Sequence, residues 1–206
     1  MATVMLLLAH PRATSYCHAL AERIGERLVD LGHEVRSHDL YAELFDPVLT
    51  AEESHTSGEA IESILAREND PMVALHREEL RRAEGLVVVH PNWWGMPPAI
   101  LTGWIDRVIV PGVAYHLEEA TGYPEPLAPI ADLFVVNTSD TTDERERDLY
   151  KDPLASIWGR CVAPYLGGPR FTRTVLRPVG DATAEQRAAW LDEVDTLAAK
   201  VFGSAP

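Results

Sequence analysis

Two adjacent tryptophans, Trp93 and Trp94, lie where a hydrophobic run gives way to a helical pattern, in VVVHPNWWGMPPAILTGWIDRV, residues 87–108. Indole rings bury large apolar planes, and stacking adds about 0.5–1.5 kcal/mol. Gly95 lets a ligand approach the backbone closely, and the two prolines that follow stiffen the loop. The segment predicts a shelf for a flat, apolar ligand. For either tryptophan alone, a place in the core or in a dimer interface is the alternative.

A second segment with binding chemistry is HPRATSYC, residues 10–17, between an apolar run and a helical pattern. The N-terminus of a helix offers unpaired N–H groups and partial positive charge, so it attracts phosphate. Thr14 and Ser15 add hydroxyl groups, and Arg12 is the only cation in the segment. The alternative is an ordinary helix cap. The chain has no GxGxxG or GxxxxGK[ST] motif, so neither a Rossmann dinucleotide site nor a P-loop is indicated.

The third segment is NTSDTT, residues 137–142, which is rich in hydroxyl and amide groups. It can line the polar edge of a heterocycle, and its composition is equally typical of a turn. An anion site, a stacking shelf and a polar rim together match a phosphorylated aromatic tricycle, which is a flavin.

Alternating strand and helix patterns must position these three segments. Strands are expected at 3–10, 33–40, 85–90, 131–137 and 170–179, and helices at 15–32, 70–84, 99–110 and 183–202, with one or two helices in 142–167 and a short one near 58–67. This alternation predicts an α/β fold with a doubly wound, five-stranded parallel sheet of order 2-1-3-4-5 and helices on both faces. Ligands of such sheets bind beyond the carboxyl ends of the strands, where the three segments lie.

Composition limits the function classes. The 206 residues suit a single domain, 1–206, and a net charge of −14 argues against nucleic-acid binding and against an anionic membrane surface. No apolar run reaches the ~20 residues that cross a bilayer, and the apolar start lacks the marks of a signal peptide. Two cysteines outside any CxxC pair make a cytoplasmic location the default expectation.

Three motifs carry a resemblance to a known family: AHPRATSYCHAL (9–20), HPNWWGMPPAILTGWIDRV (90–108) and PGVAY (111–115). They resemble the NAD(P)H:quinone oxidoreductases of flavodoxin-like fold, which include mammalian quinone reductases and ancillary subunits of bacterial potassium-efflux systems. The resemblance covers about residues 3–202.

The resemblance implies roles for individual residues. His10, Ser15, Tyr16 and Cys17 would hold the flavin phosphate. The isoalloxazine ring would lie against the third-strand loop, which comprises Pro91, Asn92, Trp93, Trp94 and Gly95. Tyr115 would line the substrate side of the partner subunit's site, so a homodimer is implied.

The chain departs from the family pattern in two places. Many relatives have Thr-Thr-Gly-Gly where this chain has Asn137, Thr138, Ser139 and Asp140, and an ionised Asp140 near a reduced, anionic flavin would be unfavourable. The tyrosine and histidine that assist charge transfer in mammalian relatives have no clear equivalent. Tyr150, with the adjacent lysine, is the substitute we expect.

The implied activity is a ping-pong, two-electron hydride transfer from NAD(P)H through flavin N5 to a quinone or similar aromatic acceptor. The flavin can be FAD or FMN. Two alternatives are a flavin-binding regulatory subunit of a transporter and a flavin-free enzyme built on the same fold. A hydrolase is disfavoured because the chain lacks a G-x-S-x-G elbow. No metal site is expected, because His33 and His38 should lie on opposite faces of a strand and no HExxH occurs.

Overall fold

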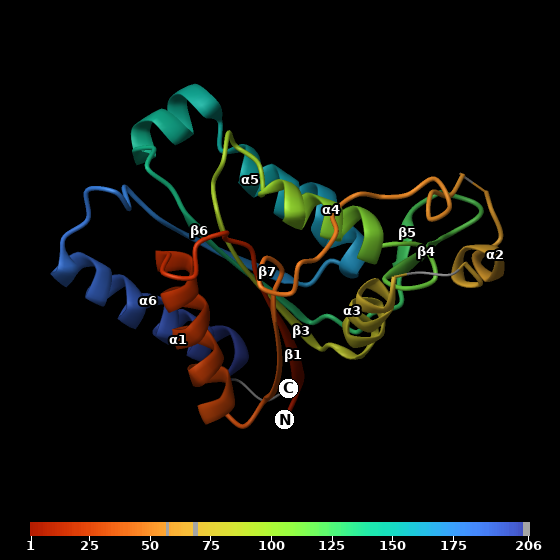
Figure 1. Ribbon diagram of the computed structural model, residues 1–206, viewed down its shortest axis with the longest axis horizontal. Coiled ribbons are helices and arrows are strands. Elements are labelled where there is room, and N and C mark those ends of the chain that lie inside the picture. Colours follow the sequence, from red (N-terminus) through yellow and green to blue (C-terminus); the bar gives the residue numbers. More distant parts are fainter. Residues whose placement is uncertain (57, 68–69, 204–206) are drawn as a thin grey trace.

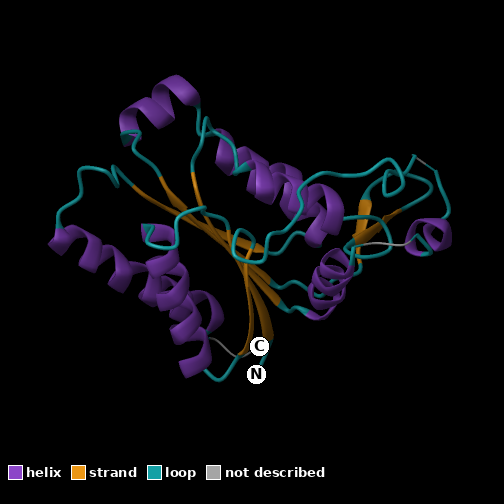
Figure 2. Cartoon of the chain, viewed as in Figure 1, coloured by secondary structure: helices purple, strands orange, loops and turns teal. Residues whose placement is uncertain are grey.

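The computed structural model describes residues 1–56, 58–67 and 70–203. A five-stranded parallel sheet forms its centre (Figures 1 and 2), in the order β2-β1-β3-β6-β7. The strands are β1 (Thr3–Leu8), β2 (Glu34–Asp39), β3 (Gly85–Pro91), β6 (Asp132–Thr138) and β7 (Arg170–Leu176). Counted along the main sheet, this is the predicted order 2-1-3-4-5, which is confirmed.

The sheet separates two apolar cores, which explains why its inner strands are continuous hydrophobic runs. Met5 and Leu7 of β1 face one core, whereas Val4, Leu6 and Leu8 face the other. Helices α1 (Tyr16–Asp30) and α6 (Ala184–Phe202) cover one face, and α3 (Pro71–Arg82) and α4 (Ala99–Val108) cover the other (Figure 1). This two-sided burial is what a parallel sheet requires.

Local signals set the ends of these helices. Gly32 follows α1 with φ of +82°, a conformation that glycine adopts without a steric penalty. Asp70 caps α3 by accepting from Met72 N at 2.7 Å, and Thr183 caps α6 by accepting from Gln186 N at 3.2 Å. A short helix, α2 (Ile61–Leu65), lies where one was expected.

The prediction of one or two helices in 142–167 is wrong in detail. The segment divides into four short pieces: η1 (Arg145–Tyr150) and η2 (Ile157–Val162), which are π-helical, α5 (Pro153–Ser156) and the 3-10 turn η3 (Ala163–Leu166). Lys151 and Asp152 break the first helix with φ of +61° and +45°. Proline begins the next piece because its missing N–H is tolerated in a first turn.

A two-stranded antiparallel hairpin, β4 (Tyr115–Leu117) and β5 (Pro124–Pro126), was not predicted. Each strand is only three residues long, too short for the alternation that marks a strand in sequence. The hairpin lies beside α2, at the opposite side of the molecule from η1 (Figure 1). Within the described residues no helix has the length and apolar character needed to cross a membrane.

Candidate functional site

The three predicted loops meet at the carboxyl ends of β1, β3 and β6. Asn92 N donates to Thr138 O at 2.7 Å, which joins the second loop to the third. Cys17 Sγ and Thr138 Oγ1 are 3.3 Å apart, which joins the first loop to the third. The rings of His10 and Trp93 lie 6.0 Å apart between centroids, which joins the first loop to the second. The three loops therefore come together at one edge of the sheet, as the predicted topology requires.

The two tryptophans lie in a tight two-residue turn. Trp93 and Met96 exchange backbone hydrogen bonds at 3.2 and 3.0 Å, and the central residues Trp94 and Gly95 have φ of +58° and +77°. Positive φ at both central positions defines a type I′ turn, which favours Asn-Gly or Gly-Gly. A tryptophan in this position is strained, and its side chain is 97% exposed, against 39% for Trp93. Strain without packing points to a function for the exposed indole.

The start of α1 is open to an anion. Ser15 occupies the cap position but makes no capping hydrogen bond to the described helix, because its Oγ contacts His18 Nδ1 at 2.9 Å. The first turn of α1 contains no acidic residue. Buried His10 accepts from Arg12 N at 3.1 Å, and burial lowers the pKa of its ring. The amides at the start of a helix suit a phosphate group.

Two residues predicted for the phosphate loop are placed less directly. Thr14 is exposed on the loop. Tyr16 packs against Trp190 and donates from its hydroxyl to Arg187 O at 2.6 Å, so the phenol is tied to α6. Its backbone amide, in the first turn of α1, is the part available to a ligand.

The third loop uses its side chains internally. Asn137 is fully buried: Nδ2 lies 2.9 Å from His90 Nε2, and Oδ1 accepts from Arg173 Nε at 2.7 Å. Trp158 Nε1 also donates to His90 Nε2, at 2.9 Å. Burial lowers the pKa of His90 to about 4, so the ring is a neutral acceptor of two hydrogen bonds.

The remaining residues of that loop are similarly engaged. Thr138 and Ser139 are buried, and Ser139 Oγ accepts from Thr141 N at 3.1 Å. Asp140 Oδ1 accepts from Gly180 N at 2.6 Å, which ties the carboxylate to the loop after β7.

A cavity of about 560 Å³ opens beside the tryptophan turn. Its lining includes the predicted residues Asn92, Trp94, Gly95 and Tyr150. Thr141, also in the lining, belongs to the predicted segment 137–142, whereas sequence reasoning missed Glu146, Leu149 and Pro153. Tyr150 is partly exposed, and its hydroxyl accepts from Arg145 Nη2 at 3.0 Å, so its own O–H remains available as a donor. The adjacent Lys151 lines a different cavity.

Tyr115 does not share this cavity. It lines a second one, of about 490 Å³, together with Pro111 and residues of α2. Its ring meets that of Tyr165 edge to face at 4.7 Å, and burial raises the pKa of its hydroxyl. The strand that carries it, β4, lies far from η1, which carries Tyr150 (Figure 1). One chain therefore does not bring the two predicted tyrosines together.

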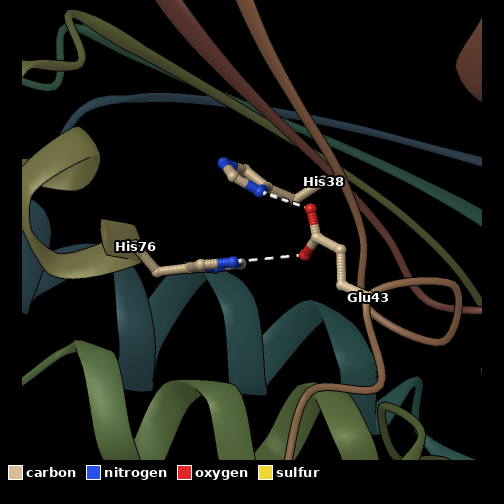
Figure 3. Close-up of side chains that lie close together, drawn as sticks. All are labelled: His38, Glu43 and His76. Carbon is tan, nitrogen blue, oxygen red and sulfur yellow. Dashed lines mark hydrogen bonds and ion pairs between the residues drawn. The ribbon is translucent and has the colours of Figure 1, made fainter. Parts of the chain in front are cut away.

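His38, Glu43 and His76 form a separate cluster, with candidate ligand atoms within 4.8 Å of one another (Figure 3). Trp104 Nε1 donates to His76 Nδ1 at 2.8 Å, so the neutral His76 ring must carry its proton on Nε2. That nitrogen lies 3.2 Å from Glu43 Oε2 and has no free lone pair for a metal. His38 contacts Glu43 and Glu79 through its two ring nitrogens. His38 thus joins β2 to α3 through Glu79, and Trp104 joins α4 to His76 of α3, whereas the buried atoms His76 Nε2 and Glu43 Oε2 make no hydrogen bond to any described residue.

Comparisons with known proteins agree with the fold. Residues 2–195 match the model of a family described as flavodoxin-like fold. The chain is 33% identical over 121 residues to NAD(P)H dehydrogenase (quinone) 1 of Rattus norvegicus, covering 54% of this chain and 44% of the relative. The chain spans about half the length of the curated relatives it matches.

Two solved structures align over nearly the whole chain. An NAD(P)H:quinone oxidoreductase from Methanothermobacter marburgensis has a TM-score of 0.78 at 22% identity and covers 100% of this chain and 98% of its own. An FMN-dependent NADH-azoreductase from Bacillus anthracis, solved in complex with FMN, has a TM-score of 0.72 at 13% identity. The alignment covers 96% of this chain and 98% of the azoreductase chain. At these identities the likeness shows the shared fold.

Proposed function

Because this chain belongs to the flavodoxin-like fold family, we propose that it is a flavin-dependent oxidoreductase that takes two electrons from NAD(P)H and passes them to a quinone or similar aromatic acceptor. The relative from Rattus norvegicus is named for the same donor and acceptor. The azoreductase that shares the fold was solved with FMN bound. Both likenesses support the proposal.

The strained, 97% exposed indole of Trp94 is the observation that carries the proposal. It borders a cavity of about 560 Å³, within the range of small-molecule sites. The open start of α1 lies at the same edge of the sheet. An apolar shelf and an anion site at one edge of the sheet fit a ring system with a phosphate tail, so the residues present suit a flavin.

When bound, the flavin would supply the hydride chemistry, and the protein would supply binding, orientation and electrostatics. The amides of Tyr16 and Cys17 would hold the phosphate. Trp94 and Gly95 would support the ring, and the free O–H of Tyr150 would donate to it.

We further propose that the protein acts as a homodimer in which Tyr115 of one copy completes the other copy's site. The separation in one chain between β4, which carries Tyr115, and η1, which contributes to the Trp94 cavity, supports this arrangement (Figure 1). A cytoplasmic location remains a prediction.

The proposal is tested by the absorbance of the purified protein and by identification of any flavin released on denaturation. Bands near those of free oxidised flavin, with quinone-dependent oxidation of NADH or NADPH, are expected. A yellow protein that oxidises neither nucleotide with any quinone would favour a regulatory role. A colourless protein that binds neither FMN nor FAD would refute the proposal.

Replacing Trp94 with glycine is expected to change stability and flavin affinity in opposite directions. Glycine adopts positive φ readily, so relief of the strain should raise the free energy of unfolding of the flavin-free protein by about 1 kcal/mol. Loss of the indole should weaken flavin binding about tenfold. Urea unfolding and flavin titration measure the two effects. Unchanged flavin affinity would remove Trp94 from the site, and Leu44→Gly, at another exposed residue with positive φ, is the matched control.

Replacing Tyr115 with alanine should slow quinone reduction about tenfold while flavin content stays near that of the wild type. Steady-state rates with a benzoquinone and flavin quantification after denaturation test this expectation. Tyr123→Ala, at an exposed residue of the same β4–β5 hairpin, is the control. A variant that loses flavin but keeps its rate per bound flavin would place Tyr115 on the cofactor side.

A further inference from the structure

Glu146 is a buried acid in the wall of the Trp94 cavity, and no sequence motif predicted it. Its Oε1 accepts from Asn92 Nδ2 at 3.2 Å. Asn92 in turn accepts from Gly95 N at 2.9 Å through Oδ1. The carboxylate of Glu146 therefore fixes the side chain of Asn92, and Asn92 in turn fixes the turn that carries Trp94.

The segment that carries Glu146 is followed by two residues with a strained backbone conformation. It is η1, the teal coil that projects from the body beside α5 in Figure 1. Lys151 and Asp152, which follow it, are both left-handed, and each such residue costs about 1–2 kcal/mol relative to a right-handed one. Glu146 O accepts from Asp152 N at 3.1 Å, and Arg173 Nη1 donates to Asp152 Oδ2 at 2.7 Å. These contacts maintain the strained connection.

The charge of Glu146 is only partly compensated. Its Oε2 lies 3.7 Å from Arg177 Nη1, and Arg177 Nε lies 3.3 Å from Asp143 Oδ1. Both Arg177 nitrogens are buried and make no hydrogen bond to any described residue. At 3.7 Å the guanidinium offsets the charge of the carboxylate less than a directly hydrogen-bonded partner would, so part of that charge acts on the adjacent cavity.

We propose that Glu146 is a positioning residue of the flavin site: its carboxylate ties η1 to the Asn92–Met96 turn, and its negative charge lowers the reduction potential of the flavin held there. The charge effect rests on the proposed function, whereas the tie between η1 and the turn does not. Reduced flavin is anionic at neutral pH, so a nearby buried carboxylate disfavours the reduced form more than the oxidised form.

Glu146→Gln separates the two roles, because glutamine keeps the acceptor for Asn92 and loses the charge. A unit charge about 10 Å away at an effective dielectric of 20 changes the preference for reduced over oxidised flavin about tenfold. For a two-electron couple that ratio equals about 30 mV. We therefore expect a flavin content like that of the wild type and a potential about 30 mV higher, measured by equilibration with a reference dye.

Asp143→Asn is the matched control, because Asp143 pairs with the same arginine but is 83% exposed and does not line the cavity. Its potential should stay close to that of the wild type. An unchanged potential in Glu146→Gln, or an equal shift in both variants, would overturn the role assigned to the charge.

Trypsin tests the positioning role in the flavin-free protein, since Arg145, Arg147 and Lys151 are trypsin sites in or next to η1. Glu146→Ala removes the acceptor for Asn92, so η1 should open more often and be cleaved about fivefold faster than in Glu146→Gln or the wild type. Equal cleavage of all three proteins would overturn the positioning role. A colourless wild type would refute the proposed function without affecting this result.

Discussion

Acidification from pH 6.5 to pH 4 is expected to destabilise the folded protein by about 3 kcal/mol for each of two buried histidines, His76 and His90. Both are fully buried. Burial first, and then the charge of nearby His38, lowers the pKa of His76 to about 3. Burial, with a smaller contribution from Arg173, lowers that of His90 to about 4. Since a domain of this size has about 5–15 kcal/mol of stability, the loss approaches acid unfolding.

The direction of this pH effect follows from the number of protons that the folded and unfolded chains bind. Below pH 6.5 each histidine binds a proton in the unfolded chain but not in the folded one, so a falling pH favours unfolding. The contribution is fully present above pH 6.5 and is lost progressively as the pH falls toward the folded pKa values.

Urea unfolding at pH 7, 5.5 and 4.5 measures the slope. His76→Gln, which can still accept from Trp104, should reduce the slope by about 1.4 kcal/mol per pH unit. His116→Gln, at a more exposed histidine, should leave it unchanged. Equal slopes in all three proteins would show that His76 is not held neutral.

Replacing Arg107 with methionine is expected to lower the free energy of unfolding by about 3–5 kcal/mol, because the buried Glu53 carboxylate loses its hydrogen-bonded arginine. Arg107 donates to Glu53 through Nε at 2.9 Å and Nη2 at 2.7 Å, and to Asp46 O at 2.5 Å through Nη1. Burial raises the pKa of Glu53, but hydrogen bonds from Arg107 and Thr50 outweigh it and the net shift is downward. The pair is therefore ionised at neutral pH.

This ion pair attaches the long connection after β2 to α4, and the same connection continues to the wall of the Tyr115 cavity. The variant should therefore also expose residues 46–56 to hydrogen exchange. The double variant with Glu53→Gln should recover part of the loss, since no charge is left unpaired. Arg81→Ala, which removes a surface pair with Glu78, should cost less than about 1 kcal/mol. If Arg107→Met were as stable as Arg81→Ala, the ion pair between Arg107 and Glu53 would contribute little to stability.

Much of the fold could be predicted because its signals are local and repeated. Continuous apolar runs such as 85–90 are typical of strands buried on both faces, and alternation with helices implies parallel pairing. Topology then places the loops after β1, β3 and β6 at one edge. The contacts of Thr138 with Asn92 and Cys17 follow from this arrangement.

Other features of the candidate site could not be predicted, because they depend on contacts between residues far apart in sequence. Nothing local to Glu146 distinguishes it from its exposed acidic neighbours; its burial arises only when η1 folds against Asn92 and Arg177. The pairing of His38 with Glu43 and His76 likewise requires β2 and α3 to be adjacent in space. Asn137 was read as a ligand donor because amides suit that role, yet His90 and Arg173 engage its side chain.

The position of Cys17 matters for a protein proposed to handle quinones, which are electrophiles that add to thiolates. The thiol is packed inside the first loop, and burial raises its pKa to about 11 despite the contact with Thr138. At neutral pH it is almost entirely protonated, and the protonated thiol is a poor nucleophile. The loop thus keeps a sulfur atom against Thr138, at the edge of the sheet where the three loops meet, without offering it for arylation by the acceptor.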